Sequence, residues 1–190
     1  AGAMNWRVLL IALAALGLFA ILVWLVTGTG GPAARFDREI PVDQLPTPTP
    51  PPEQQVVLLF LGPDGRLHPE LRTVPLPQEV GARARVVVEE LLAGSIGGLG
   101  SVIPYQADVN AVFVDERGNA FIDLTAPPEP LEGSHLELTL AYGVVDSVLL
   151  NCPELRAVQI LFGGREVATL TGHLDLSRPL VLNKRFIAQS

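Results

Sequence analysis

An uncharged, apolar run over residues 8–26 constrains this chain more than any other feature. As an α-helix its 19 residues would extend about 28 Å, close to the roughly 30 Å hydrocarbon core of a bilayer. The chain's two tryptophans, Trp6 and Trp24, lie near the ends of the run, and indole rings favour the headgroup region. The run lacks the polar stripe of a soluble amphipathic helix. We therefore predict a transmembrane helix over residues 6–26.

A cleaved secretory signal is the alternative, because small residues follow the run at 27–29. Signal peptides usually carry an apolar region of about 7–15 residues, so the longer run here favours an uncleaved anchor. Residues 1–5 are interpreted as a tag remnant and a short cytoplasmic head. Arg7 precedes the run and Arg35 and Arg38 follow it, so nearby charges are almost balanced. The short head favours a single-pass protein of the bacterial inner membrane with its domain in the periplasm or extracytoplasmic space.

A proline-rich linker is predicted over residues 27–54. Prolines at 46, 48 and 50–52 fix φ and remove backbone donors, which favours extended polyproline II. Such a segment is a semi-rigid spacer between the membrane and a folded domain. A ligand for a proline-recognition domain is the alternative interpretation.

The remaining chain is long enough for one domain, predicted over residues 55–180 with a C-terminal tail over 181–190. From residue 53 onward there are 10 Lys and Arg against 17 Asp and Glu. This acidic balance disfavours nucleic acid as a partner, since nucleic-acid binding needs a clustered basic surface. The single cysteine, Cys152, excludes an internal disulfide, so a hydrophobic core must stabilise the domain.

Hydrophobic periodicity predicts the order β–β–α–β–β–α–β–β. The prolines at 75 and 77 restrict the second strand to an edge or an excursion. Gly94 is the predicted stop of the first helix. The order favours an α+β fold with two helices on one face of a mainly antiparallel sheet. The predicted strands cover residues 56–61, 71–76, 109–115, 120–124, 157–162 and 166–170, and the helices cover 80–91 and 134–150.

The second predicted helix opens on Ser134 and Glu137, which have the spacing of a capping box. It is apolar on more than one face, which indicates either deep burial or contact with a partner. On the second reading, Leu136, Leu140 and Val144 form an interaction surface.

Candidate chemistry is sparse. The three histidines, His68, His135 and His173, lack the spacing and partners of a zinc site. No nucleophile motif surrounds Cys152, which lies at an apolar helix end and is predicted to be buried. We therefore predict no catalytic residues, no metal site, no cofactor and no enzymatic activity.

Several segments together resemble the GerMN domain of sporulation and spore-germination proteins. They run in the family's order from about residue 56 to residue 180. Two departures are the Asp-Ser-Val at 146–148, where the family tends to carry Asn-Thr-Leu, and the glycine-rich loop at 95–100. The matching segments are DGRL at 64–67, RTVPLP at 72–77, EELLAG at 89–94, AFIDL at 120–124, VQILF at 158–162 and GHLDLSRPL at 172–180.

The resemblance implies a non-catalytic extracytoplasmic module, similar to ring-building folds of cell-envelope machines, that acts through protein contacts. Its expected partners are other envelope proteins or a second copy of itself. A cell-wall glycan or peptide, including peptidoglycan, is the alternative ligand, and a hydrolase is less favoured. The resemblance carries over no catalytic, metal or cofactor-binding residue.

Overall fold

The computed structural model describes residues 16–19, 21–25, 50–127 and 129–189. The chain divides into two compact units, Ala1–Pro48 and Thr49–Ser190. In the first unit, residues 16–19 and 21–25 are helical, and the rest of the predicted span lies outside the described residues. No described helix combines the length and the apolar character needed to cross a membrane. The predicted linker lies outside the described residues up to residue 49.

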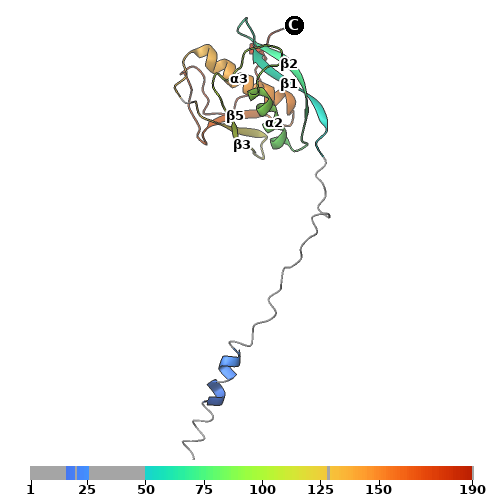
Figure 1. Cartoon of the computed structure of the whole chain (residues 1–190). Helices are drawn as coiled ribbons and strands as arrows, with labels where there is room; N and C mark the ends of the chain where they lie inside the picture. Colours follow the sequence, from blue (N-terminus) through green and yellow to red (C-terminus); the bar gives the residue numbers. More distant parts are fainter. Residues whose placement is uncertain (1–15, 20, 26–49, 128, 190) are drawn as a thin grey trace, which may run out of the picture. The chain divides into compact units, whose positions relative to one another are not determined.

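The second unit contains a hairpin, two helices and a three-stranded sheet (Figure 1). Its elements in chain order are β1 (Glu53–Leu61), β2 (Leu67–Pro75), α2 (Val80–Leu92), β3 (Val109–Val114), β4 (Asn119–Leu124), α3 (Ser134–Asn151), β5 (Ala157–Phe162) and the 3-10 turn η2 (Lys184–Phe186).

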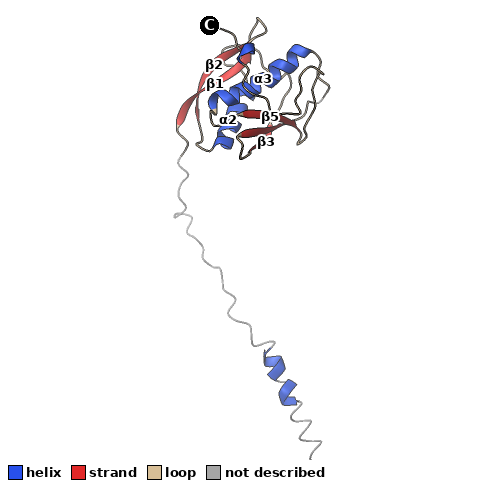
Figure 2. Ribbon diagram, turned by 180° about the vertical axis from the view of Figure 1, so that it is seen from behind, coloured by secondary structure: helices blue, strands red, loops and turns tan. Residues whose placement is uncertain are grey.

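The two helices lie between the β1–β2 hairpin and the second sheet (Figures 1 and 2). Helix α3 contacts β1, β5 and α2, while α2 contacts β1 and β3. The mixed α+β class is thus confirmed, but the strands form two sheets, so the prediction of a single sheet is wrong. Because α3 meets strands from both sheets, it is buried almost all round, which explains its apolar residues on more than one face.

The second sheet has the order β3-β4-β5. Strands β3 and β4 form the predicted antiparallel hairpin, whereas β5 runs parallel to β4. The parallel pair follows from the chain path, because α3 carries the chain back between these two strands. The sheet is therefore mixed rather than mainly antiparallel.

Strand β2 is a regular edge strand despite its prolines. It pairs with β1 from Glu53↔Pro75 to Leu61↔Leu67. The N–H groups of Val57 and Leu59 bond to α3, so their partners Leu71 and Pro69 also direct backbone groups away from the hairpin. Proline fits these outward positions because no ladder bond is lost there.

The other edge of β1 is covered by polar side chains of α3. Asn151 accepts a hydrogen bond from the Val57 N–H at 2.9 Å and donates one to the Val57 carbonyl at 2.8 Å. One helical turn earlier, the Ser147 hydroxyl accepts from the Leu59 N–H at 3.0 Å. Side chains four residues apart on a helix thus replace a neighbouring strand.

The last predicted strand, residues 166–170, does not form. Beyond β5 only one bridge joins Phe162 to Arg165, after which the chain leaves the sheet. The free edge of β5 is instead occupied by Leu180, which exchanges two hydrogen bonds with Val158. The segment after residue 165 is therefore free to bond elsewhere in the domain.

Helix α2 begins and ends where the sequence predicts. The Glu79 carboxylate caps it by accepting from the N–H groups of Gly81 and Ala82. Gly94 follows its end with a φ of 87°, a conformation that favours glycine. Its buried residues are Ala84, Val87, Val88 and Leu91, which lie on one helical face.

Candidate functional site

The residues predicted to form an interaction surface lie on α3. Leu140 and Val144 are fully buried in the hydrophobic core of this chain, and Leu136 is half-buried. In this structure Leu140 and Val144 are therefore not exposed to a partner. An interface formed by this helix stays a prediction that a charged substitution tests.

The Glu137 side chain accepts more hydrogen bonds than any other side chain in the described part of the chain. Its carboxylate is fully buried and accepts six hydrogen bonds from the segment 169–174. Oε1 accepts from the Thr169 hydroxyl and from the N–H groups of Leu170 and Thr171. Oε2 accepts from the Thr171 hydroxyl and from the N–H groups of His173 and Leu174.

These contacts correct the predicted capping box. The residue before α3 is Gly133, with a φ of 101°, and no side chain caps the helix. The Glu137 carboxylate turns instead to the 169–174 segment. Burial alone would raise the pKa of Glu137, but the hydrogen bonds from that segment outweigh burial and lower the pKa to about 2.

A second cluster, which is half-buried, joins β2 to the end of α2. The Arg72 guanidinium bonds to the carboxylates of Glu70 and Glu90, at 2.8 and 2.9 Å, and to the Gly94 carbonyl at 2.8 Å. Glu70 also accepts from the Ser95 hydroxyl and the Gly97 N–H. Burial would raise the pKa of Glu70, but these donors lower it to about 2. The cluster anchors the glycine-rich loop whose shape the sequence left open.

Two further carboxylates hold turns. Asp123 on β4 accepts from the Gly164 N–H at 2.7 Å, directly after β5. Asp115 accepts from the N–H groups of Arg117 and Asn119 and closes the turn between β3 and β4. Each of these acids is thus engaged by donors of a nearby loop.

This arrangement is suited to holding loops rather than to proton transfer. The carboxylates of Glu70 and Glu137 are ionised and surrounded by donors, so neither is set up as a general base. Cys152 is buried, and burial raises the pKa of its thiol to about 11, which disfavours the reactive thiolate. Within residues 50–127 and 129–189 no group of three or more His, Cys, Asp or Glu is placed to bind a metal ion.

The surface of the domain carries isolated exposed apolar side chains. Phe113 on β3 is the only aromatic of the described domain residues among them, at 64% exposure. It lies opposite half-buried Phe121 of β4, so the two rings share the outer face of the second sheet. A hollow of about 380 Å³ beside Phe113 is lined by β3 and by the first turns of α2. The other exposed large apolar residues of the domain are Leu71, Ile96 and Val181.

The fold and these anchors define a small mixed α+β module whose buried charged groups hold its loops. A family model described as "Germane: Sporulation and spore germination" matches residues 57–168. The chain belongs to this family, which confirms the resemblance to GerMN domains. A search of curated protein sequences gives no match.

Solved structures with a similar fold include three chains of low sequence identity. A candidate lipoprotein from Clostridium perfringens is 15% identical, with a TM-score of 0.47 over 68% of this chain and 87% of that one. The first GerMN domain of GerM from Bacillus subtilis is 16% identical, with a TM-score of 0.45 over 67% and 97%. The tandem GerMN domains of the same protein are 17% identical, with a TM-score of 0.43 over 67% of this chain and 46% of that chain.

Sequence reasoning did not identify Glu137 or Glu70 as anchors. Glu137 carried a helix-start signal, and its true partners lie more than thirty residues later in the chain. Glu70 and Arg72 alternate along β2, which places both on one face of the strand. That alternation was the available signal for a shared cluster.

Proposed function

We propose that this protein is a non-catalytic, membrane-tethered module that binds another envelope protein, or a second copy of itself, outside the cytoplasm. Membership of the sporulation and germination family is the observation that carries the proposal. The engagement of the buried acids by loop donors supports a module that acts through its surface rather than through chemistry.

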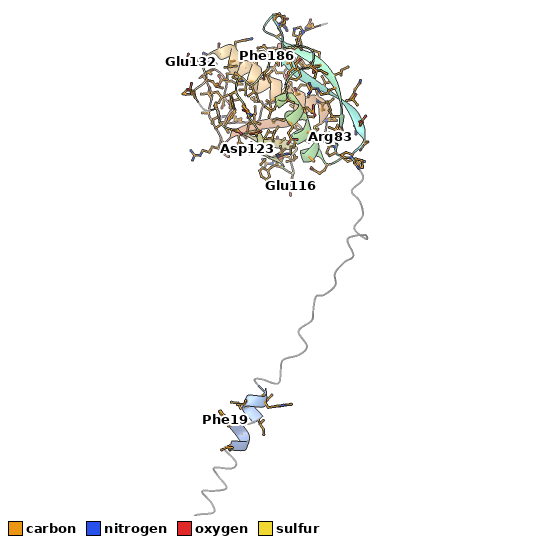
Figure 3. All side chains as sticks on the ribbon, in the orientation of Figure 1. Phe19, Arg83, Glu116, Asp123, Glu132 and Phe186 are labelled. Atoms are coloured by element: carbon orange, nitrogen blue, oxygen red, sulfur yellow. The ribbon has the colours of Figure 1, made fainter. Side chains whose placement is uncertain are left out.

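The N-terminal segment supports the tether. The described residues at 16–19 and 21–25 form helix and expose apolar side chains such as Leu18, Phe19 and Trp24. Phe19 is labelled in Figure 3. Exposed apolar side chains of this size are stable in lipid and unfavourable in water. Tethering confines the module to the membrane surface, where a raised effective concentration lets weak contacts suffice.

Phe113 supports protein recognition, because exposed aromatic residues are enriched at the centres of interfaces. The other domain aromatics are less available for stacking on sugars. Tyr105 donates its hydroxyl to the Thr125 carbonyl, and Tyr142 stacks on Phe186. This arrangement favours a protein partner over the cell-wall glycan of the alternative interpretation.

The proposal is tested by photo-crosslinking in native membranes. A photoreactive residue replaces Phe113 in the full chain, and the matched control carries it at exposed Leu71 of β2. We expect a discrete adduct with one envelope protein, or with a second copy, from the Phe113 position. Recovery of the full chain from lipid-free cytosol would refute the tether. Retention on purified peptidoglycan without a protein adduct would favour the glycan alternative.

A further inference from the structure

The C-terminal segment, residues 181–188, closes over α3 and the start of β2. The Asn183 N–H donates to Asp146 Oδ1 at 3.0 Å. The Phe186 ring stacks on Tyr142, one helical turn before Asp146, with centroids 4.8 Å apart. The segment then reaches β2, where the Ala188 N–H donates to the Leu67 carbonyl at 2.8 Å.

Asp146 is an unusual group to find beneath this cover. The residue is fully buried in the middle of α3. Oδ1 accepts only the bond from Asn183, and Oδ2 has no hydrogen-bond partner among the described residues. An ionised carboxylate in this position lacks the donors that surround Glu137, and a buried charge without partners is strongly disfavoured.

None of the ionisable groups on the elements packed against α3 forms an ion pair with Asp146 in the described part of the chain. Strand β5 has no ionisable residue, and β1 has only Glu53 at its start. On α2, Arg83 pairs with Glu154, Arg85 pairs with Glu89, and Glu90 pairs with Arg72. The remaining groups are the exposed Lys184 and Arg185 of η2, and on α3 itself His135, Glu137 and Tyr142.

We propose that the C-terminal segment is a proton-controlled cover, which closes when the Asp146 carboxyl is protonated and loosens when it is ionised. The neutral acid keeps the Asn183 bond at Oδ1 and avoids the cost of burying a charge. The ionised acid needs water or further donors. When the C-terminal segment opens at Asn183, water reaches Asp146 while α3 stays folded.

The sign follows from linkage. Burial raises the pKa of Asp146 to about 6 from an ordinary 3.8, partly opposed by the Asn183 N–H. If opening restores the ordinary pKa, closure is favoured at low pH and weakens as the pH rises from about 4 to about 6. The equilibrium constant for closing of the segment then falls roughly thirtyfold between pH 4.5 and pH 7.5. Glu70 and Glu137, each with a pKa of about 2, remain ionised across this range, so their anchors persist.

Opening exposes a specific surface. Residue 67 is an outward position of β2, and the segment pairs with it through Ala188 and the parallel bridge from Ile187. Loss of these contacts frees the Leu67 carbonyl and lengthens the open edge of β2.

The test is amide hydrogen exchange of the full chain at pH 4.5 and pH 7.5, corrected for the intrinsic exchange rate at each pH. We expect protection at residues 183 and 188 to fall about thirtyfold at the higher pH, while protection in β4 stays constant. Asp146→Asn keeps the Oδ1 acceptor but has no charge. We expect this variant to show equal corrected protection at both pH values.

A second variant keeps the test decisive. Phe186→Ala removes the stack on Tyr142, so we expect lower protection of the segment at both pH values with the pH dependence retained. The proposal is overturned if the wild-type segment is equally protected at both pH values. It is also overturned if Asp146→Asn keeps the wild-type pH dependence. Should that variant not fold, loss of the pH dependence in Phe186→Ala overturns it.

Discussion

Replacement of Glu137 by glutamine tests the role of the buried carboxylate most directly. The amide has the same shape, but its nitrogen donates where the carboxylate oxygen accepts. Whichever position the nitrogen takes, it faces one threonine hydroxyl, which can rotate, and two backbone N–H groups, which cannot. Two buried N–H groups therefore lose their acceptor.

The expected loss follows from these two groups. Each unsatisfied buried donor costs about 1–3 kcal/mol, so Glu137→Gln should lower the free energy of unfolding by roughly 2–6 kcal/mol. The pKa of Glu137, which reflects the same hydrogen bonds, gives a second figure. A folded-state pKa of about 2 against an ordinary 4.5 corresponds to about 3 kcal/mol of stability from the ionised group. This stability is present above pH 4.5 and is lost as the pH falls through 2.

The assay is urea unfolding of the full chain at pH 7, followed by far-UV circular dichroism, with Glu132→Gln as the control. Glu132 is an exposed glutamate five residues earlier, so its substitution should change stability by less than about 0.5 kcal/mol. A loss below about 1 kcal/mol for Glu137→Gln would refute the reasoning. So would a destabilisation of equal size at pH 7 and at pH 2, where about half of the wild-type Glu137 groups are protonated.

Three other substitutions test the packing of α3. Asn151→Ala removes both hydrogen bonds to the Val57 backbone and should cost about 1–3 kcal/mol in urea unfolding. Gly143→Ala places a methyl group 2.7 Å from the Val102 side chain, so a loss of about 1–3 kcal/mol is expected in the same assay, and an unchanged midpoint would contradict this close approach. Leu140→Lys buries a charge in the core and should abolish the cooperative transition; a folded variant that only loses association would restore Leu140 to an interface.

Local patterns predicted most of the individual elements. Helix α2 has a clean apolar stripe and a glycine stop, and both survive because its polar face meets solvent. The strands β3, β4 and β5 also follow their apolar runs. The prolines of β2 restricted it to an edge, as the structure confirms, although it starts earlier than predicted.

The failures involve residues whose partners are distant in the chain. Ser134 and Glu137 have the spacing of a helix start, but donors at 169–174 provide a more complete set of bonds for the carboxylate. The run at 166–170 has strand character, yet Leu180 occupies the edge it would need. In both places a long-range contact outweighs a local preference.

The sequence alone determined three properties of this chain. They are one acidic domain without an internal disulfide, the position of its helices, and a resemblance to a sporulation and germination family. These properties depend on composition and short-range periodicity, which need no knowledge of neighbours in space. Tertiary structure decided that α3 lies between two sheets and that β5 runs parallel to β4. It also decided which buried acids receive donors and which, at Asp146, receives almost none. Those outcomes depend on which distant segments come into contact. The free energy of a buried charge depends on the donors that such contacts bring to it.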